Sequence, residues 1–121
     1  MHFLILTLAA FALPAAAAEM TGAEVYDSTC RECHASGKHN APKFGVPSRW
    51  KKLIREGLDE IVPEALHGVR KMPPKGGNPA LSDLEVARAV IFMANAGGGK
   101  FTEPTPAKVE QWRKKADAKQ R

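Results

Sequence analysis

Two cysteines and a histidine stand close together as Cys30, Cys33 and His34, and their spacing constrains the fold more than any other feature. On a helix, residues at i, i+3 and i+4 share one face, so the three side chains would point the same way. Two such thiols can form thioethers with the vinyl groups of a haem, while the adjacent imidazole reaches the iron. We therefore predict a helix through these residues, with one flat ring bound covalently to it.

Other uses of a Cys-x-x-Cys pair fit this chain less well. A zinc site needs a second Cys or His pair, but Cys30 and Cys33 are the only cysteines, and His39 and His67 are far apart. A thiol redox pair of the thioredoxin type is expected beside a βαβ pattern, which is absent from the sequence. The two cysteines are also too close to close a large disulfide loop. Haem attachment is thus favoured over zinc binding and thiol chemistry.

The N-terminal segment Met1 to Ala18 contains no Lys, Arg, Asp or Glu. Its apolar stretch, Phe3 to Leu13, is too short to span a membrane, and the alanines that follow provide an A-x-A cleavage site before Glu19. We predict a cleaved signal peptide over residues 1–18, a periplasmic location, and a mature protein without a transmembrane segment. The start of the segment has no Lys or Arg, so retention as an anchor is the alternative.

Helical signals occur along the rest of the chain. Capping boxes, in which Ser or Thr is followed three residues later by Glu, mark helix starts at Thr21 and Ser82. We expect the first helix to end at His34 and the other to end at Gly97, where its apolar stripe stops. Ser48 is expected to cap a shorter amphipathic helix between them. No alternating run predicts a strand, so the fold class is all-α.

Composition divides the chain into the signal peptide (1–18), a haem domain (19–97), and a linker with a basic C-terminal tail (98–121). The tail holds seven Lys or Arg and three Asp or Glu, which is +4 of the total net charge of +5. We expect a solvated, partly disordered helix in the tail, with Val109 and Trp112 as a small contact face. The alternative is a docking segment for an acidic partner or a membrane surface.

An iron that only transfers electrons needs a second axial ligand, because six-coordinate iron has no open position for substrate. The candidates are Met20, His39, His67, Met72 and Met93. Met20 precedes the first helix, Met93 belongs to an apolar stripe, and His39 is too close to His34 in the chain. Met72 is far enough away to wrap around the ring, and two following prolines hold its backbone still. Met72 is preferred, with His67 as the alternative.

From Gly22 to Gly97 the sequence resembles the class I c-type cytochromes, particularly the small bacterial cytochrome c-five branch. The resemblance rests on five motifs in chain order: Cys30-Arg31-Glu32-Cys33-His34, Ala41-Pro42-Lys43-Phe44-Gly45, Trp50, Met72-Pro73-Pro74-Lys75-Gly76-Gly77 and Leu81-Ser82-Asp83. It implies the cytochrome c fold, with three to five helices around one covalent haem c, and a crossing of the first and last helices near Gly22, Tyr26 and Phe92.

The resemblance also implies residue roles. Cys30 and Cys33 would be the thioether anchors, with His34 as proximal ligand and Met72 as distal ligand. Pro42 or its neighbour would accept a hydrogen bond from the other ring nitrogen of the histidine.

Two further positions stand apart from these roles. Trp50 would line the haem or reach a propionate, although a tryptophan on an amphipathic helix is equally well explained as core. Cytochromes of this branch often carry a cysteine pair where this chain has Asn78 and Leu81, so no second disulfide is expected.

These predictions describe an electron-transfer protein and not an enzyme: a soluble, monomeric, periplasmic monohaem cytochrome that carries single electrons between redox partners, without nucleic-acid binding. Lysines at 38, 43, 71 and 75 flank the two haem-binding loops and would steer a partner with an acidic docking surface; the alternative is that they are ordinary solvated lysines. Two other functions fit the sequence: a haem c subunit of a larger oxidoreductase, assembled through residues 100–121, and a ligand sensor with five-coordinate iron.

Overall fold

The computed structural model describes residues 9–12 and 18–119, so most of the predicted signal peptide (1–18) lies outside the described residues. Within those residues the secondary structure is helical, without a β-strand, which confirms the all-α prediction. The α-helices are α1 (Gly22–Val25), α2 (Arg31–His34), α3 (Pro47–Glu56), α4 (Leu58–His67), α5 (Asp83–Ala96) and α6 (Pro106–Asp117). None of the described helices is long and apolar enough to cross a membrane.

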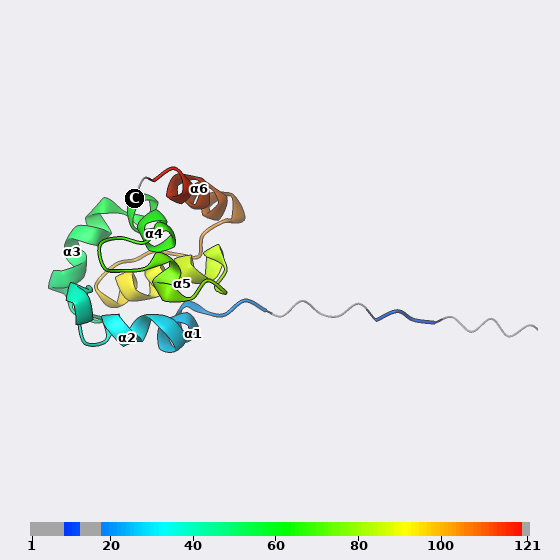
Figure 1. Ribbon diagram of the computed structural model, residues 1–121, viewed down its shortest axis with the longest axis horizontal. Helices are drawn as coiled ribbons and strands as arrows, with labels where there is room; N and C mark the ends of the chain where they lie inside the picture. Colours follow the sequence, from blue (N-terminus) through cyan, green and yellow to red (C-terminus); the bar gives the residue numbers. More distant parts are fainter. Residues whose placement is uncertain (1–8, 13–17, 120–121) are drawn as a thin grey trace, which may run out of the picture.

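The helices stack around α5. Figure 1 shows α6, α4, α5 and the α1–α2 pair one above the other, with α3 along one side. Half of the residues of α5 are buried, because apolar side chains along it pack against neighbours on several sides: Val86, Ala87, Ala89, Val90, Ile91, Met93 and Ala94. Its capping box is formed as predicted: the Ser82 hydroxyl accepts from the Glu85 N–H at 3.1 Å, and the Glu85 carboxylate accepts from the Ser82 N–H at 2.9 Å.

The N-terminal helix runs from Gly22 to His34 without a break, through α1, the π-helical segment η1 (Tyr26–Cys30) and α2. A capping box at Thr21 starts it, as predicted. The helix crosses α5 so closely that a Cβ on Gly22 would lie 2.3 Å from the Arg88 carbonyl oxygen. The rings of Tyr26 and Phe92 are 5.6 Å apart at the same crossing, as the resemblance implied.

The helices α3 and α4 follow each other with only Gly57 between them. Its φ of 85° is accessible to glycine at low cost and allows the chain to turn sharply at this point. The prediction that Ser48 caps α3 is wrong, because the helix begins at Pro47 with Val46 at its N-cap position. Proline suits the first helical position, where its missing N–H would have had no partner within the helix.

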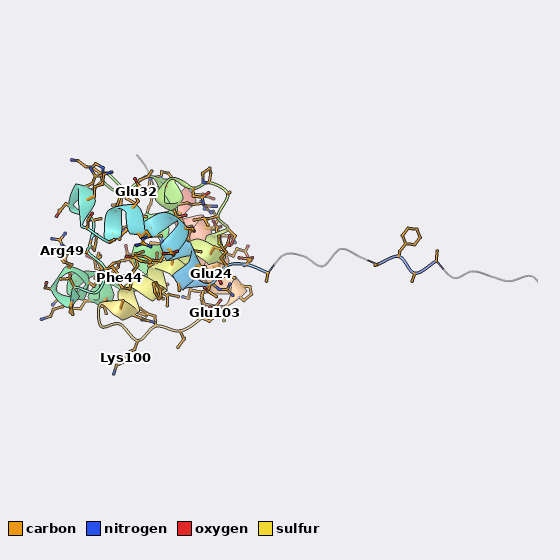
Figure 2. All side chains as sticks on the ribbon, turned by 90° about the horizontal axis from the view of Figure 1, so that it is seen from below. Glu24, Glu32, Phe44, Arg49, Lys100 and Glu103 are labelled. Atoms are coloured by element: carbon orange, nitrogen blue, oxygen red, sulfur yellow. The ribbon has the colours of Figure 1, made fainter. Side chains whose placement is uncertain are left out.

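The C-terminal helix α6 packs on the domain, and the prediction of a solvated, partly disordered tail is wrong. Trp112 is 2% exposed and Ala116 1% exposed, and both belong to the main core cluster. Val109 packs against the same cluster, so the contact face expected for Val109 and Trp112 exists and is covered by this chain's own domain. The segment between α5 and α6 stays at the surface, where Lys100 projects away from the body of the protein (Figure 2).

Candidate functional site

One cavity collects every side chain to which the sequence assigned a role in binding haem. It has a volume of about 450 Å³, within the usual range for small-molecule and cofactor sites. Its walls include Cys30, Cys33, His34, Pro42, Trp50 and Met72. Aliphatic side chains from α3, α4, α5 and the loop after α4 make up much of the remaining wall: Leu53, Ile61, Ala65, Val69 and Val90. A flat apolar ring fits such a lining, because the walls offer few polar groups that would lose water.

The two thiols are not joined in a disulfide, and both are partly buried at the cavity wall. Burial raises the pKa of the Cys30 thiol to about 11. A thiol with this pKa is protonated at neutral pH, which disfavours both metal–thiolate binding and thiol–disulfide exchange. Within residues 9–12 and 18–119, no three His, Cys, Asp or Glu side chains cluster as a metal site would require. The Cys30 thiol therefore suits covalent attachment better than either rival chemistry.

The His34 imidazole has one ring nitrogen committed to the protein. Its Nδ1 lies 2.8 Å from the Pro42 carbonyl oxygen, which can only accept a hydrogen bond, so Nδ1 donates. Burial lowers the pKa of His34, and the bond to Pro42 opposes this only in part. The ring is therefore neutral at neutral pH, with a lone pair on Nε2 that can bind a metal ion. This is the contact that the resemblance implied for Pro42.

Trp50 forms part of the cavity wall and part of the core at once. It is 3% exposed and packs with Met93 and Ala94, while its ring centroid lies 6.1 Å from that of His34. The indole N–H donates to the Lys43 carbonyl oxygen at 3.1 Å. Because the indole N–H makes this bond, it is not free to bind a propionate. Of the roles expected for Trp50, the structure therefore shows two: lining the cavity and packing in the core.

Met72 is held by a tight turn at the end of α4. Its N–H donates to the Val69 carbonyl oxygen at 2.8 Å, and the Val69 N–H donates back to the Met72 carbonyl oxygen at 3.0 Å. Arg70 adopts a positive φ of 51° inside the turn. Gly68, with φ of 90°, admits the returning chain, because a Cβ there would lie 3.0 Å from the Met72 oxygen. Sequence analysis did not single out Gly68, although a glycine after a helix end is a known turn signal.

The other candidates for the distal ligand are divided by the structure. Met93 and His39 line the cavity, although Met93 is 3% exposed and packed in the core. Met20 is not among the lining residues, and His67 lines an adjoining cleft that shares Met72 with the cavity. Met93 is packed in the core and His39 lies only five residues after the proximal His34, which leaves Met72 as the preferred cavity-lining candidate.

A polar link is found after the Gly-Gly, at the position where the resembling cytochromes often carry a cysteine pair. The Asn78 amide donates to the Thr29 hydroxyl at 3.3 Å, which ties the end of the Met72 loop to the helix that carries Cys30. The Asn78 carbonyl oxygen also accepts from the Leu81 N–H at 3.2 Å. Sequence analysis named Asn78 only as a departure from the family pattern and missed this partner, which lies 49 residues away.

Lys75 takes neither of the two roles expected for the loop lysines, since it is neither free to steer a partner nor simply solvated. This side chain is 20% exposed, donates to the Leu81 carbonyl oxygen at 2.5 Å and pairs with Asp83 at 3.5 Å. Neither Lys43 nor Lys75 is among the lining residues of the cavity; the Lys and Arg residues that line it are Lys38, Arg70 and Lys71, all exposed. Lys38 lies 3.9 Å from Glu32, a distance at which surface pairs contribute little.

Comparisons with known proteins agree with this site. Residues 17–93 match the family model described as "Cytochrome C oxidase, cbb3-type, subunit III". The chain is 38% identical over 82 residues to cytochrome c-555 of Prosthecochloris aestuarii, covering 61% of this chain and 83% of the relative. It is also 38% identical over 76 residues to cytochrome c5 of Azotobacter vinelandii, covering 61% and 92%. A structure described as an "electron transfer complex of nitrite reductase with cytochrome c" contains a chain that is 38% identical, with a TM-score of 0.61, covering 63% of this chain and 93% of that one.

Proposed function

This chain belongs to the cytochrome c family, as a small class I c-type cytochrome similar to cytochrome c5, and on that premise we propose that it is a periplasmic monohaem carrier of single electrons. Cytochromes of this kind hold haem c covalently and transfer electrons without being enzymes. When bound, the haem supplies an iron that changes between the ferric and ferrous states. The protein's contribution is to anchor, ligate and shield that group.

The observation that carries the proposal is the convergence of four sulfur and nitrogen groups on one apolar cavity. Cys30 and Cys33 anchor the haem through thioethers. His34 presents Nε2 as the proximal ligand, because Pro42 holds its Nδ1–H. Met72 supplies the distal sulfur from a loop fixed by its turn with Val69. A thioether in this position favours the ferrous state and raises the reduction potential.

The cations at the cavity support a partner with an acidic docking surface. Lys38, Arg70 and Lys71 line the cavity and are exposed, and no carboxylate pairs with Arg70 or Lys71 among the residues that the structure describes. Opposite charge on a redox partner would speed the encounter and orient it. The similar cytochrome c in complex with nitrite reductase supports a redox protein as the partner class. We propose that the free protein is a monomer.

Export rests on the sequence of residues 1–18, which has the apolar stretch and small residues of a cleavable signal peptide. Cell fractionation followed by determination of the mature N-terminus tests it. The expected result is a periplasmic protein that begins at Glu19, and a protein that remains with the membrane and starts at Met1 would contradict cleavage.

The ligand assignment is tested by absorption spectra of the ferric and ferrous protein. Ferric wild type is expected to show the weak red charge-transfer band of Met-ligated iron, and Met72→Ala is expected to lose it. Met93→Leu is the matched control, because it removes the other methionine sulfur at the cavity while nearly conserving volume. A band that is absent from wild type, or that survives in Met72→Ala, would contradict the assignment of Met72.

A second candidate function is a haem c subunit of a larger oxidoreductase, because the matching family model describes an oxidase subunit. The predicted assembly element does not favour it, since the apolar face of α6 is buried on its own chain. Co-purification and gel filtration at high salt separate the two: a free carrier elutes alone, whereas a subunit stays in its complex.

The five-coordinate sensor has its own test. Rapid carbon monoxide binding to the native ferrous protein would indicate the five-coordinate sensor.

A further inference from the structure

The helix α6 lies beyond residues 17–93, the part of the chain that the family model matches, yet charged side chains attach it to the domain. Lys108 pairs with Asp59 at 3.3 Å, and Lys115 pairs with Glu60, both on α4. Trp112 donates its indole N–H to Asp59 at 2.8 Å. The acidic groups that pair with the basic tail are therefore carboxylates on the protein's own surface.

One of these attachments continues into the Met72 loop. The guanidinium of Arg113 binds both oxygens of the Asp83 carboxylate, at 2.5 and 2.9 Å. Two parallel bonds between a guanidinium and a carboxylate are stronger and more directional than a single contact. The same carboxylate pairs with Lys75 at 3.5 Å, so Asp83 joins α6 to the loop. All three side chains are at most one third exposed, which limits screening by water and salt.

The loop residue in this network has a strained backbone. Lys75 lies three residues after Met72, in the 3₁₀ segment η3 (Pro74–Gly77), and has a φ of 54°. A left-handed conformation is unfavourable for a residue with a side chain, and it persists where surrounding contacts hold it. The contacts here are the bonds from its Nζ to Leu81 and Asp83. The left-handed conformation of Lys75 thus depends on the Asp83 carboxylate, which Arg113 holds in position.

We propose that α6 is a positioning element for the distal ligand: Arg113, acting through Asp83 and Lys75, keeps the loop closed so that the Met72 sulfur stays at the haem. The inference rests on the proposed function in its assignment of Met72. Arg113 does not touch the cavity and acts only through the network. Loss of the network raises the fraction of molecules with an open loop, while the N-terminal haem anchor stays intact.

The experiment measures imidazole binding to the ferric holoprotein, because imidazole takes the distal position only when Met72 has left it. Its apparent affinity therefore rises in proportion to the open fraction. Arg113→Gln is expected to raise that affinity about three- to tenfold, the range for one charged hydrogen-bonded pair that is partly exposed. Lys75→Gln is expected to do the same, and the double variant should show no more than the larger single effect, since both act in one network.

Two variants on α6 control for general loosening of the helix. Trp112→Phe loses the bond to Asp59 and is expected to lower the urea midpoint while leaving imidazole affinity within about twofold of wild type. Glu110→Gln removes an exposed partner of Lys114 and is expected to change neither quantity.

Three results would overturn the inference. They are an unchanged imidazole affinity in Arg113→Gln, a rise in imidazole affinity in Trp112→Phe as large as that in Arg113→Gln, or a double variant whose rise in affinity is the product of the two single rises. If wild type lacks the charge-transfer band, the assignment of Met72 fails as well. If the band is present and Arg113→Gln binds imidazole like wild type, only the role of α6 fails.

Discussion

Substitution of Gly22 by alanine tests how closely the N-terminal helix and α5 must approach. The new Cβ would lie 2.3 Å from the Arg88 carbonyl oxygen, 2.8 Å from its carbonyl carbon and 3.0 Å from the Phe92 Cβ. Backbone atoms of a buried helix cannot rotate away as a long side chain can. Ordinary van der Waals contact begins near 3.4 Å, so the two helices would have to separate by about 1 Å.

The expected loss follows from two opposing effects. Overpacking a well-packed contact costs about 1–3 kcal/mol, and a clash with backbone belongs near the upper end. Replacing glycine by alanine restricts the unfolded chain and returns about 0.4–1 kcal/mol. The net expectation for Gly22→Ala is a loss of about 2 kcal/mol, which lowers the melting temperature of a domain of this size by roughly 10 °C.

Thermal and urea unfolding of the ferric holoprotein, followed by circular dichroism, measure this loss. Gly45→Ala is the matched control, because Gly45 has a φ of 73° but no heavy atom within 4 Å of the added Cβ. It reports only the backbone strain, on the order of 1 kcal/mol. A melting temperature for Gly22→Ala within about 2 °C of wild type, or a loss no larger than that of Gly45→Ala, would refute the close-approach argument.

Three more outcomes are expected. Trp112→Ala should lower the free energy of unfolding by about 3 kcal/mol in urea titrations, since the indole is almost fully buried; an unchanged midpoint would show that α6 does not stabilise the domain. Arg113 lowers the pKa of Asp83 below its unfolded value of about 3.9, so the pair stabilises the protein above that pH. The difference in the free energy of unfolding between wild type and Asp83→Asn should therefore shrink as the pH falls from about 5 to about 2, and a constant difference would contradict the ion pair. A Cys30→Ser, Cys33→Ser double variant isolated without haem should lose cooperative thermal unfolding by circular dichroism, and a sharp transition would contradict the expected dependence on haem.

Local signals in the sequence predicted the helix starts and the part of the site that lies on one helix. The capping boxes at Thr21 and Ser82 need only residues three apart, and both form. The face shared by Cys30, Cys33 and His34 follows from helical periodicity, and the structure places all three at one cavity. The π-helical segment that ends at Cys30, the first cysteine, was not predictable, because it depends on how the helix packs.

Long-range pairing was beyond the sequence. Lys75 was predicted to be free because it lies in a loop, yet its partner Asp83 stands eight residues away at the start of α5. Arg113 lies 30 residues beyond that carboxylate, and nothing in the order of charges indicates that they meet. Composition alone described the tail as basic, and it could not show that the acids that bind it belong to α4 and α5. Local periodicity predicts which face is apolar, whereas the fold decides what covers it.

The size of the cavity explains why a chain this short needs both its cofactor and its tail. Without its cofactor, a cavity of about 450 Å³ leaves its aliphatic walls in contact with water, and exposed apolar surface costs roughly 25 cal/mol for each Å². The whole stability of a typical domain is about 5–15 kcal/mol, so the haem is a structural part of the core as well as its redox group. The wall of that core includes a loop, and loops are the segments that open first. A helix that covers α4 and holds the Met72 loop through Asp83 therefore stabilises a part of the haem site that lies outside the α-helices.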